Sequence, residues 1–275
     1  MKRAYNSPSL ALLLLIVAIA LLVAAAPAAA GIRYKAVTKT QDAGGGMDMV
    51  VEGQVEGGKA RVDFKESRNP LAQAGSYLVT KDGGRTVYLV DPEEKTYAVY
   101  DLQALLGAAG SMLQGMGPLL KFEVSEPKVE KLAEEDGGTV VGLPTRHYRF
   151  RTSYSMKIKV FGMGQANNVV TEQDIWATDK VQDPGLGVWL RSSQPRTGNE
   201  QLDRLIASET GKVQGFPLKS VTVSTSTDKK GKATVSRVTT EVTELKTGVS
   251  VAESAFEIPA GYEEMQIAFP GQEGR

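Results

Sequence analysis

The 275-residue sequence has no cysteine and only one histidine, His147. The absence of cysteine excludes disulfide bonds, thiol nucleophiles and iron–sulfur clusters, and the lone imidazole excludes zinc sites built from several Cys or His ligands. An excess of one charge is also missing, because 32 basic residues balance 32 acidic residues. Without a positive field or a basic arm, nucleic acid is not favoured as a partner. No residue set indicates a metal or another cofactor.

The N-terminus carries the one long apolar run. Lys2 and Arg3 precede an uninterrupted apolar stretch over 10–23, and alanines at 28–30 provide small residues for a peptidase. This order is typical of a signal peptide over residues 1–30, cleaved before Gly31. The alternative is a retained anchor, although the stretch is shorter than the roughly 20 residues that span a bilayer. We therefore expect a periplasmic or secreted protein, not membrane-spanning after cleavage, with residues 31–275 as a single domain.

Period-2 alternation of apolar and polar residues recurs along most of the remaining chain, as expected for antiparallel strands with one solvated face. Turn-forming residues separate these runs at 57–58, 82–84, 91–94, 136–138 and 228–231. The predicted strands are 32–40, 47–56, 59–66, 76–81, 85–91, 95–100, 121–126, 146–161, 168–178, 187–193, 217–226 and 233–246. So many neighbouring strands predict a mainly β fold, a strongly curved antiparallel sheet that forms an unclosed barrel.

The clearest alternation covers 147–160. One face of this predicted strand carries Tyr148, Phe150, Thr152, Tyr154, Met156, Ile158 and Val160, and the other carries His147, Arg149, Arg151, Ser153, Ser155, Lys157 and Lys159. The basic residues of the second face are typical of a solvated strand surface. The functional alternative is contact with acidic head groups or an anionic partner.

Two segments depart from the β pattern. Residues 199–208 predict a short amphipathic helix with Asn199 as its N-cap. Residues 102–120 contain no charged residue, and Asp101 is a natural N-cap for them. Their apolar residues follow helical spacing: Leu102, Leu105, Leu106, Ala109, Leu113, Met116 and Leu120. Because four glycines and Pro118 weaken such a helix, the segment is either a core helix under the sheet or a mobile plug that leaves when an apolar ligand enters.

Short motifs along the chain resemble those of known exported families. They lie at 76–79, 86–92, 142–148, 175–178 and 256–262. With the signal peptide and the apolar helix, they resemble the LolA/LolB-like periplasmic lipoprotein-carrier superfamily and the related DUF4412-type proteins of unknown function. The resemblance implies a half-barrel sheet whose hollow side is plugged by helices, and in the carriers this hollow takes acyl chains.

These observations predict an exported, non-enzymatic protein that binds an acyl chain, a lipid or a lipoprotein between the sheet and the 102–120 plug. The candidate ligand-binding residues are Leu105, Leu106, Leu113, Met116, Tyr148, Phe150, Tyr154, Met156, Ile158 and Val160. The alternative is an envelope protein-binding or sensor module with a packed, ligand-free interior. An empty apolar cavity favours the first function, and a filled one favours the second.

Catalysis is the last alternative. His147 could act as a general base for a serine nucleophile, but the sequence has no Gly-x-Ser-x-Gly motif that would present such a serine. Glu172 and Asp174 share one strand face, as glycosidase carboxylates can, but flanking surface residues give the same pattern. The glycines at 44–46 lack the lysine of a phosphate-binding loop. Trp176 and Trp189 fit either the mouth of a cavity or a packed core.

Overall fold

The computed structural model describes residues 31–41, 48–69, 72–101, 103–104, 107, 111, 115, 120–161, 163–186, 196–209 and 212–265. The expected signal peptide and the predicted strand 187–193 lie outside the described residues.

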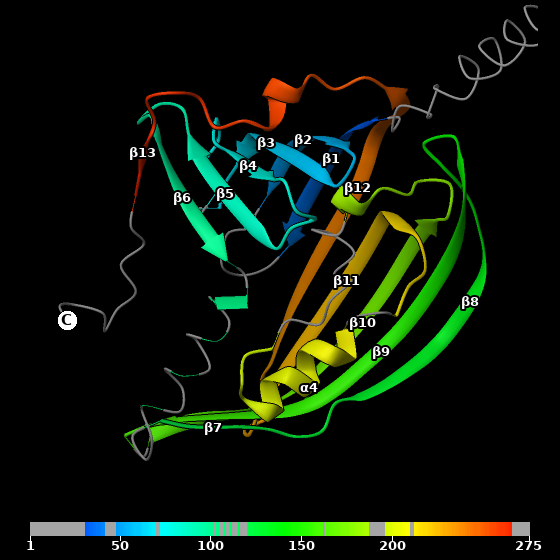
Figure 1. Cartoon of the computed structure of the whole chain (residues 1–275). Helices are drawn as coiled ribbons and strands as arrows, with labels where there is room; N and C mark the ends of the chain where they lie inside the picture. The colour runs from blue at the N-terminus through cyan, green and yellow to red at the C-terminus, as the bar shows by residue number, and fades with distance from the viewer. Residues whose placement is uncertain are drawn as a thin grey trace, which may run out of the picture.

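A single sheet contains every described strand (Figure 1). The strands are β1 (Gly31–Gln41), β2 (Met49–Glu56), β3 (Lys59–Ser67), β4 (Tyr77–Thr80), β5 (Thr86–Asp91), β6 (Thr96–Asp101), β7 (Leu120–Val124), β8 (Lys128–Val140), β9 (Leu143–Val160), β10 (Met163–Thr178), β11 (Phe216–Asp228), β12 (Ala233–Val249) and β13 (Glu263–Glu264). The helical elements with assigned bounds are α4 (Glu200–Glu209) and the 3-10 turns η2 (Pro184–Leu186) and η3 (Glu253–Phe256).

The strand order is β13-β6-β5-β4-β3-β2-β1-β12-β11-β10-β9-β7, and β8 pairs with β9 along the same edge as β7. All pairs are antiparallel except the short β13–β6 pair. The order begins and ends on different strands, so the described strands form an open sheet. This is the mainly β, unclosed fold that the sequence predicted.

Strand β1 joins the two halves of the sheet. It pairs with β2 on one side and with β12 on the other, so that Val37 lies opposite both Val50 and Glu241. The first half is a meander of short strands from β1 to β6. The second half consists of the long strands β9 to β12, which extend away from the first half in Figure 1.

The predicted strands that fall within the described residues are all present. Strand β8 was not predicted, because its charged sequence shows no clear alternation. The prediction of a turn at 136–138 was wrong: these residues lie within β8, where its register with β9 shifts between Asp136 and Thr139. The turn between β8 and β9 is instead formed by Val141 and Gly142. Both residues have positive φ, as the common two-residue hairpin turn requires.

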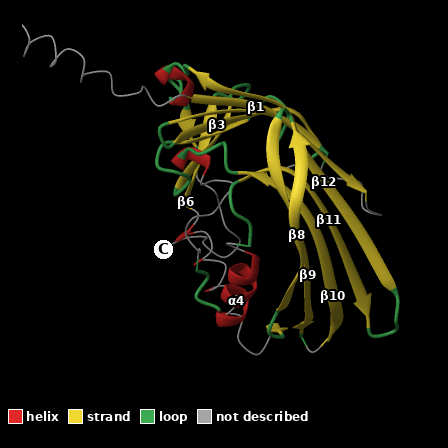
Figure 2. Ribbon diagram, turned by 90° about the vertical axis from the view of Figure 1, so that its right-hand side faces the viewer, coloured by secondary structure: helices red, strands yellow, loops and turns green. Residues whose placement is uncertain are grey.

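The helix α4 lies on the face around which the sheet curves, which we call the inner face (Figure 2). In the short-strand half, this face is packed. Its core consists of Ile32, Tyr34, Ala36, Val51, Val55, Ala60, Val62, Phe64, Ala72, Val181, Leu186, Phe216, Leu218 and Val242. The turn η2 is fixed there because the Asp183 carboxylate accepts hydrogen bonds from the backbone N–H groups of Gly57, Gly58 and Gly185.

The opposite, outer face of the short-strand half is covered by the C-terminal segment. Phe256 of η3 and Val251 pack with Tyr77 and Val79 of β4 and Val90 of β5. The chain then continues to β13, which pairs with β6. Both faces of the short-strand half are therefore covered by other segments of the chain. Exposed apolar side chains lie instead on the long strands.

Candidate functional site

Alternate side chains of β9 point to the inner face and change from buried to open along the strand. Tyr148 and Phe150 are buried and stack with ring centroids 6.3 Å apart. Tyr154 and Met156 are half-buried, and Ile158 is 37% exposed. Period-2 geometry places these residues on one face, and the tertiary structure closes only one end of the row. The far end of β9 is therefore an apolar surface next to solvent.

A groove of about 270 Å³ lies over this far end. It is lined by Met156 and Ile158 of β9 and by Met163, Gly164, Gln165 and Asn167 of β10. The register of the two strands accounts for this lining, because Met156 pairs with Asn167 and Ile158 with Gln165. The groove has room for part of an apolar chain, and the flexible thioethers of its two methionines suit irregular packing.

The sequence-predicted ligand residues therefore fall into three groups. Tyr148 and Phe150 belong to a packed cluster with Ala177 and Val213. Tyr154, Met156 and Ile158 lie at or near the groove. The others, Leu105, Leu106, Leu113, Met116 and the side chain of Val160, lie outside what the structure describes.

The beginning of the 102–120 segment is held at two points. The Asp101 carboxylate accepts a hydrogen bond from the backbone N–H of Ala104 at 2.8 Å, which confirms Asp101 as an N-cap. The Gln103 side-chain amide donates to the Arg196 carbonyl and accepts from its N–H. Of the described residues within the segment, those at 103–104, 107, 111 and 115 are helical. The helical assignment of Leu120 was wrong, because Leu120 is the first residue of β7 and pairs with Val160 of β9. The segment thus starts close to the loop that leads into α4.

The helix α4 bridges two strands on the inner face. Its N-cap is Asn199, as predicted, whose side-chain oxygen accepts hydrogen bonds from the N–H groups of Gln201 and Leu202. The side-chain oxygen of Gln201 accepts a hydrogen bond from the backbone N–H of Val124 in β7 at 2.7 Å. At the other end of α4, Glu209 accepts a hydrogen bond from the Thr152 hydroxyl of β9 at 3.2 Å.

An ion pair between a buried lysine and a partly exposed glutamate at this end of α4 was missed by the sequence analysis. The ammonium of Lys212 donates to Glu209 Oε1 at 2.7 Å, to Thr152 Oγ1 at 2.9 Å and to Gln173 Oε1 at 3.3 Å. It also lies 5.7 Å from the centre of the Phe150 ring. A Glu and a Lys three residues apart after a predicted helix are common on surfaces, so the sequence carried no signal that Lys212 is buried.

Tyr154 lies next to this pair on β9. Burial, and then the negative charge of Glu209, raise the pKa of the Tyr154 hydroxyl above its ordinary value. The tyrosine is therefore neutral at physiological pH. Along the inner face of β9, Tyr154 lies between Thr152, which contacts Lys212, and Met156, which lines the groove.

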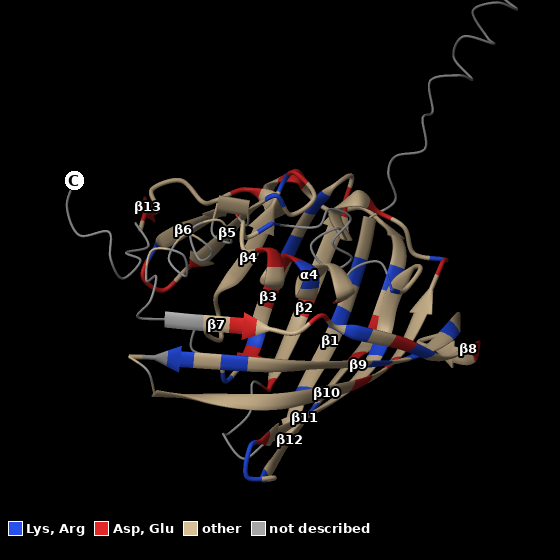
Figure 3. Cartoon of the chain, turned by 90° about the horizontal axis from the view of Figure 1, so that it is seen from below, with Lys and Arg blue, Asp and Glu red and all other residues tan. Residues whose placement is uncertain are grey.

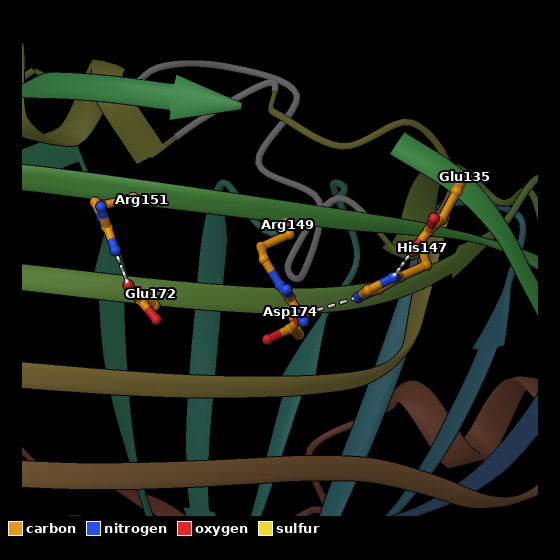
Figure 4. Close-up of polar contacts among 6 residues, drawn as sticks. All are labelled: Glu135, His147, Arg149, Arg151, Glu172 and Asp174. Atoms are coloured by element: carbon orange, nitrogen blue, oxygen red, sulfur yellow. Dashed lines mark hydrogen bonds and ion pairs between the residues drawn. The ribbon is translucent and has the colours of Figure 1, made fainter. Parts of the chain in front are cut away.

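The outer face of β9 and β10 carries a closed polar cluster around His147 (Figure 4). The imidazole Nε2 lies 2.8 Å from Asp174 Oδ1, and Nδ1 lies 3.2 Å from Glu135 Oε1 of β8. The ring stacks on Trp176 with centroids 4.5 Å apart. Because both nitrogens face carboxylates of this chain, the imidazole is not placed to activate a nucleophile. Trp189 lies outside the described residues.

Three of the four Lys and Arg residues that the sequence placed on this face of β9 are paired with carboxylates. Arg149 donates to Asp174 at 2.8 Å, Arg151 donates to Glu172 at 3.0 Å, and Lys157 lies 2.8 Å from Glu123. These hydrogen bonds and charges raise the pKa of both arginines above the ordinary value. Figure 3 shows basic and acidic residues interspersed along the strands. Such pairing matches a solvated strand surface better than an anion-binding patch.

Two features are absent from the described part of the chain. There, no helix has both the length and the apolar character needed to cross a membrane. Over the same residues, no three His, Asp or Glu side chains are grouped closely enough to hold a metal ion.

Three solved structures are similar to this chain at 10–12% sequence identity. The LolA superfamily protein NE2245 from Nitrosomonas europaea is 10% identical over 84% of this chain and 91% of that chain, with a TM-score of 0.29. A DUF1329 family protein from Desulfovibrio piger ATCC 29098 is 12% identical over 86% and 93%, with a TM-score of 0.31. The structure of PNGF-II is 12% identical over 86% of this chain and 30% of that chain, with a TM-score of 0.32. No curated protein matches significantly.

The sequence model of one family, described as a domain of unknown function (DUF4412), matches residues 37–262. The match includes β9, β10 and α4, and so includes the groove and the Glu209–Lys212 ion pair. Since it covers more than half of the sequence, the chain belongs to the DUF4412 family.

Proposed function

We propose that the protein is an exported, non-enzymatic protein that holds an acyl chain or a similar apolar ligand on the inner face of its sheet, beneath the 102–120 segment. The observation that carries this proposal is the row of inner-face side chains on β9, which is buried at one end and opens into an apolar groove at the other. Export rests on the signal-peptide pattern of residues 1–30.

The energetics of the groove support an apolar ligand. Each methylene that leaves water gains about 0.8 kcal/mol before the costs of ordering are subtracted. The lining residues Met156, Ile158 and Met163 offer such contacts without a competing charge. Lipid esters or lipoproteins with an exposed acyl chain belong to the same ligand class. The closed cluster around His147 supports a binding role over a hydrolytic one.

A second candidate function is binding of an envelope protein. It is favoured by β8, which pairs with β9 alone among the described strands and exposes Val129 and Leu132. An edge strand with exposed apolar side chains can pair with another chain. The packed inner face of the short-strand half also fits this alternative. The two functions differ in whether the ligand lies in the groove or along the edge.

Two equally exposed residues provide a matched test. Ile158 and Val170 are each 37% exposed, but Ile158 lines the groove, whereas Val170 pairs with Ser153 on the outer face. We expect Ile158→Glu to weaken binding of a fluorescent fatty-acyl probe at least about tenfold, because the charge would have to be desolvated. Val170→Glu should bind the probe like the parent.

Native mass spectrometry of the protein purified without detergent gives an independent readout. Copurifying acyl species near a one-to-one ratio, lost in Ile158→Glu, are expected. A folded Ile158→Glu variant that binds the probe as tightly as the parent would contradict the proposal. A ligand-free mass, together with no uptake of added fatty acid or phospholipid, would also contradict it. Binding of an envelope protein through β8 would then become the leading function.

A further inference from the structure

The side chain of Lys212 is only 7% exposed, although it carries a charge. Burying an ammonium is costly unless its donors are used and its charge is balanced. All three donors of Lys212 have partners, in Glu209, Thr152 and Gln173. Thr152 is itself 1% exposed. The inner face thus contains a preformed cationic group with a fixed hydroxyl beside it.

These groups converge on one carboxylate oxygen. Glu209 Oε1 receives both the Lys212 ammonium at 2.7 Å and the Thr152 hydroxyl at 3.2 Å. An ammonium and a hydroxyl that meet on one oxygen form a carboxylate-binding arrangement. In this structure the carboxylate belongs to the chain itself.

Two features of Glu209 favour its exchange for another carboxylate. It is the last residue of α4, where the helix dipole disfavours negative charge. Its side chain is 38% exposed, so it can turn to solvent without passing through the core. If a carboxylate from a ligand took this position, the Glu209 carboxylate would be hydrated rather than left buried without a partner.

The buried lysine lies in line with the apolar groove. Thr152, Tyr154, Met156 and Ile158 follow one another on the inner face of β9. At about 3.3 Å per residue, Thr152 and Ile158 are roughly 20 Å apart along the strand. A ligand with an acyl tail in the groove and an anionic head at Lys212 would lie along the strand, past the Tyr154 ring.

We propose that Lys212 and Thr152 bind the carboxylate head group of the ligand, in exchange for Glu209. This inference rests on the proposed function and narrows the ligand class to the anions of free fatty acids, in preference to neutral acyl esters. Glu209 acts as an internal competitor that satisfies Lys212 when no ligand is bound.

The test compares oleate with methyl oleate, which share the acyl chain but differ in charge. Displacement of a neutral fluorescent acyl probe gives both affinities for the purified protein. We expect the parent to prefer oleate. The double variant Lys212→Met/Glu209→Gln, which leaves no unpaired buried charge, should lose about tenfold to a hundredfold in oleate affinity and retain methyl oleate. Glu209→Gln alone should bind oleate more tightly than the parent.

The matched control is Lys180→Met/Asp179→Asn, which removes an exposed ion pair of 3.2 Å elsewhere on the chain. It should leave both affinities unchanged, and circular dichroism verifies the fold of each variant. Equal binding of the two ligands by the parent, or a folded double variant that still prefers oleate, would overturn the role of Lys212 and leave the proposed function standing. Binding of neither ligand by the parent would overturn both.

Discussion

At the scale of single residues, a close approach between β1 and β2 shows how tightly the inner core constrains the sequence. Gly53 lies opposite Tyr34, whose ring occupies the space where a side chain at position 53 would lie. A Cβ atom there would be 2.0 Å from Tyr34 Cζ. Tyr34 in turn packs edge-on against Phe216 at 6.0 Å, so its ring has little room to move.

We therefore expect Gly53→Ala to lower the free energy of unfolding by about 1–3 kcal/mol, the usual cost of overpacking a core. Urea denaturation measures this loss. The control is Gly115→Ala, where an added Cβ meets nothing within 4 Å. It should be neutral or slightly stabilising, because Gly115 is helical. Equal stability of Gly53→Ala and the parent would show that Tyr34 can repack.

At the scale of elements, the turn between β4 and β5 is organised by one carboxylate. Asp82 accepts hydrogen bonds from the backbone N–H of Thr86 and from the Thr80 hydroxyl. The Thr80 hydroxyl oxygen in turn accepts a hydrogen bond from the backbone N–H of Gly84. Burial alone would raise the pKa of Asp82, but the hydrogen bonds from Thr86 and Thr80 outweigh it, and the pKa is lowered.

A lowered pKa in the folded state gives a definite pH dependence. The ionised Asp82 contributes stability above its unfolded pKa of about 4, and this contribution disappears as the pH falls through the lower, folded value. We expect Asp82→Asn to be less stable than the parent at pH 7 and to approach it below about pH 3. Thermal unfolding between pH 7 and pH 2.5 measures the difference. A stability gap that is constant over this range would mean that the charge of Asp82 does not contribute.

At the scale of the whole molecule, the C-terminal segment holds the outer face of the short-strand half. Phe256 is 1% exposed and packs against a cluster that includes Tyr77, Val79 and Val90. The Arg61 guanidinium lies 3.7 Å from the centre of the Tyr77 ring in the same region. Without this segment, the buried side chains of β4 and β5 would face water.

Phe256→Ala should therefore destabilise the protein by about 3–5 kcal/mol, as expected for a large aromatic residue removed from a core. The comparison variant is Met265→Ala, since Met265 follows on the same segment but is 51% exposed. It should change stability by less than about 0.5 kcal/mol. Differential scanning calorimetry of both variants provides the measurement. Similar melting temperatures for the two would show that the segment is not needed to close the outer face.

The local pattern of residues in the sequence was enough to predict the strands, the helix caps and the family. Period-2 alternation predicted the strands and told which β9 side chains share a face, because a strand fixes side-chain direction from residue to residue. The caps Asp101 and Asn199 were readable for the same reason, since a cap bonds to N–H groups two or three residues away. The family was also readable, from motifs spread along the whole chain.

Tertiary structure decided everything that depends on distant partners. Strand β8 exists because β9 offers it an edge, not because its charged sequence favours a strand. Burial along β9 depends on what covers each residue, so Phe150 and Ile158 share a pattern but not an environment. Lys212 meets Thr152 across 60 residues of sequence. No local spacing encodes that contact, because it arises only when α4 folds back onto the inner face of the sheet.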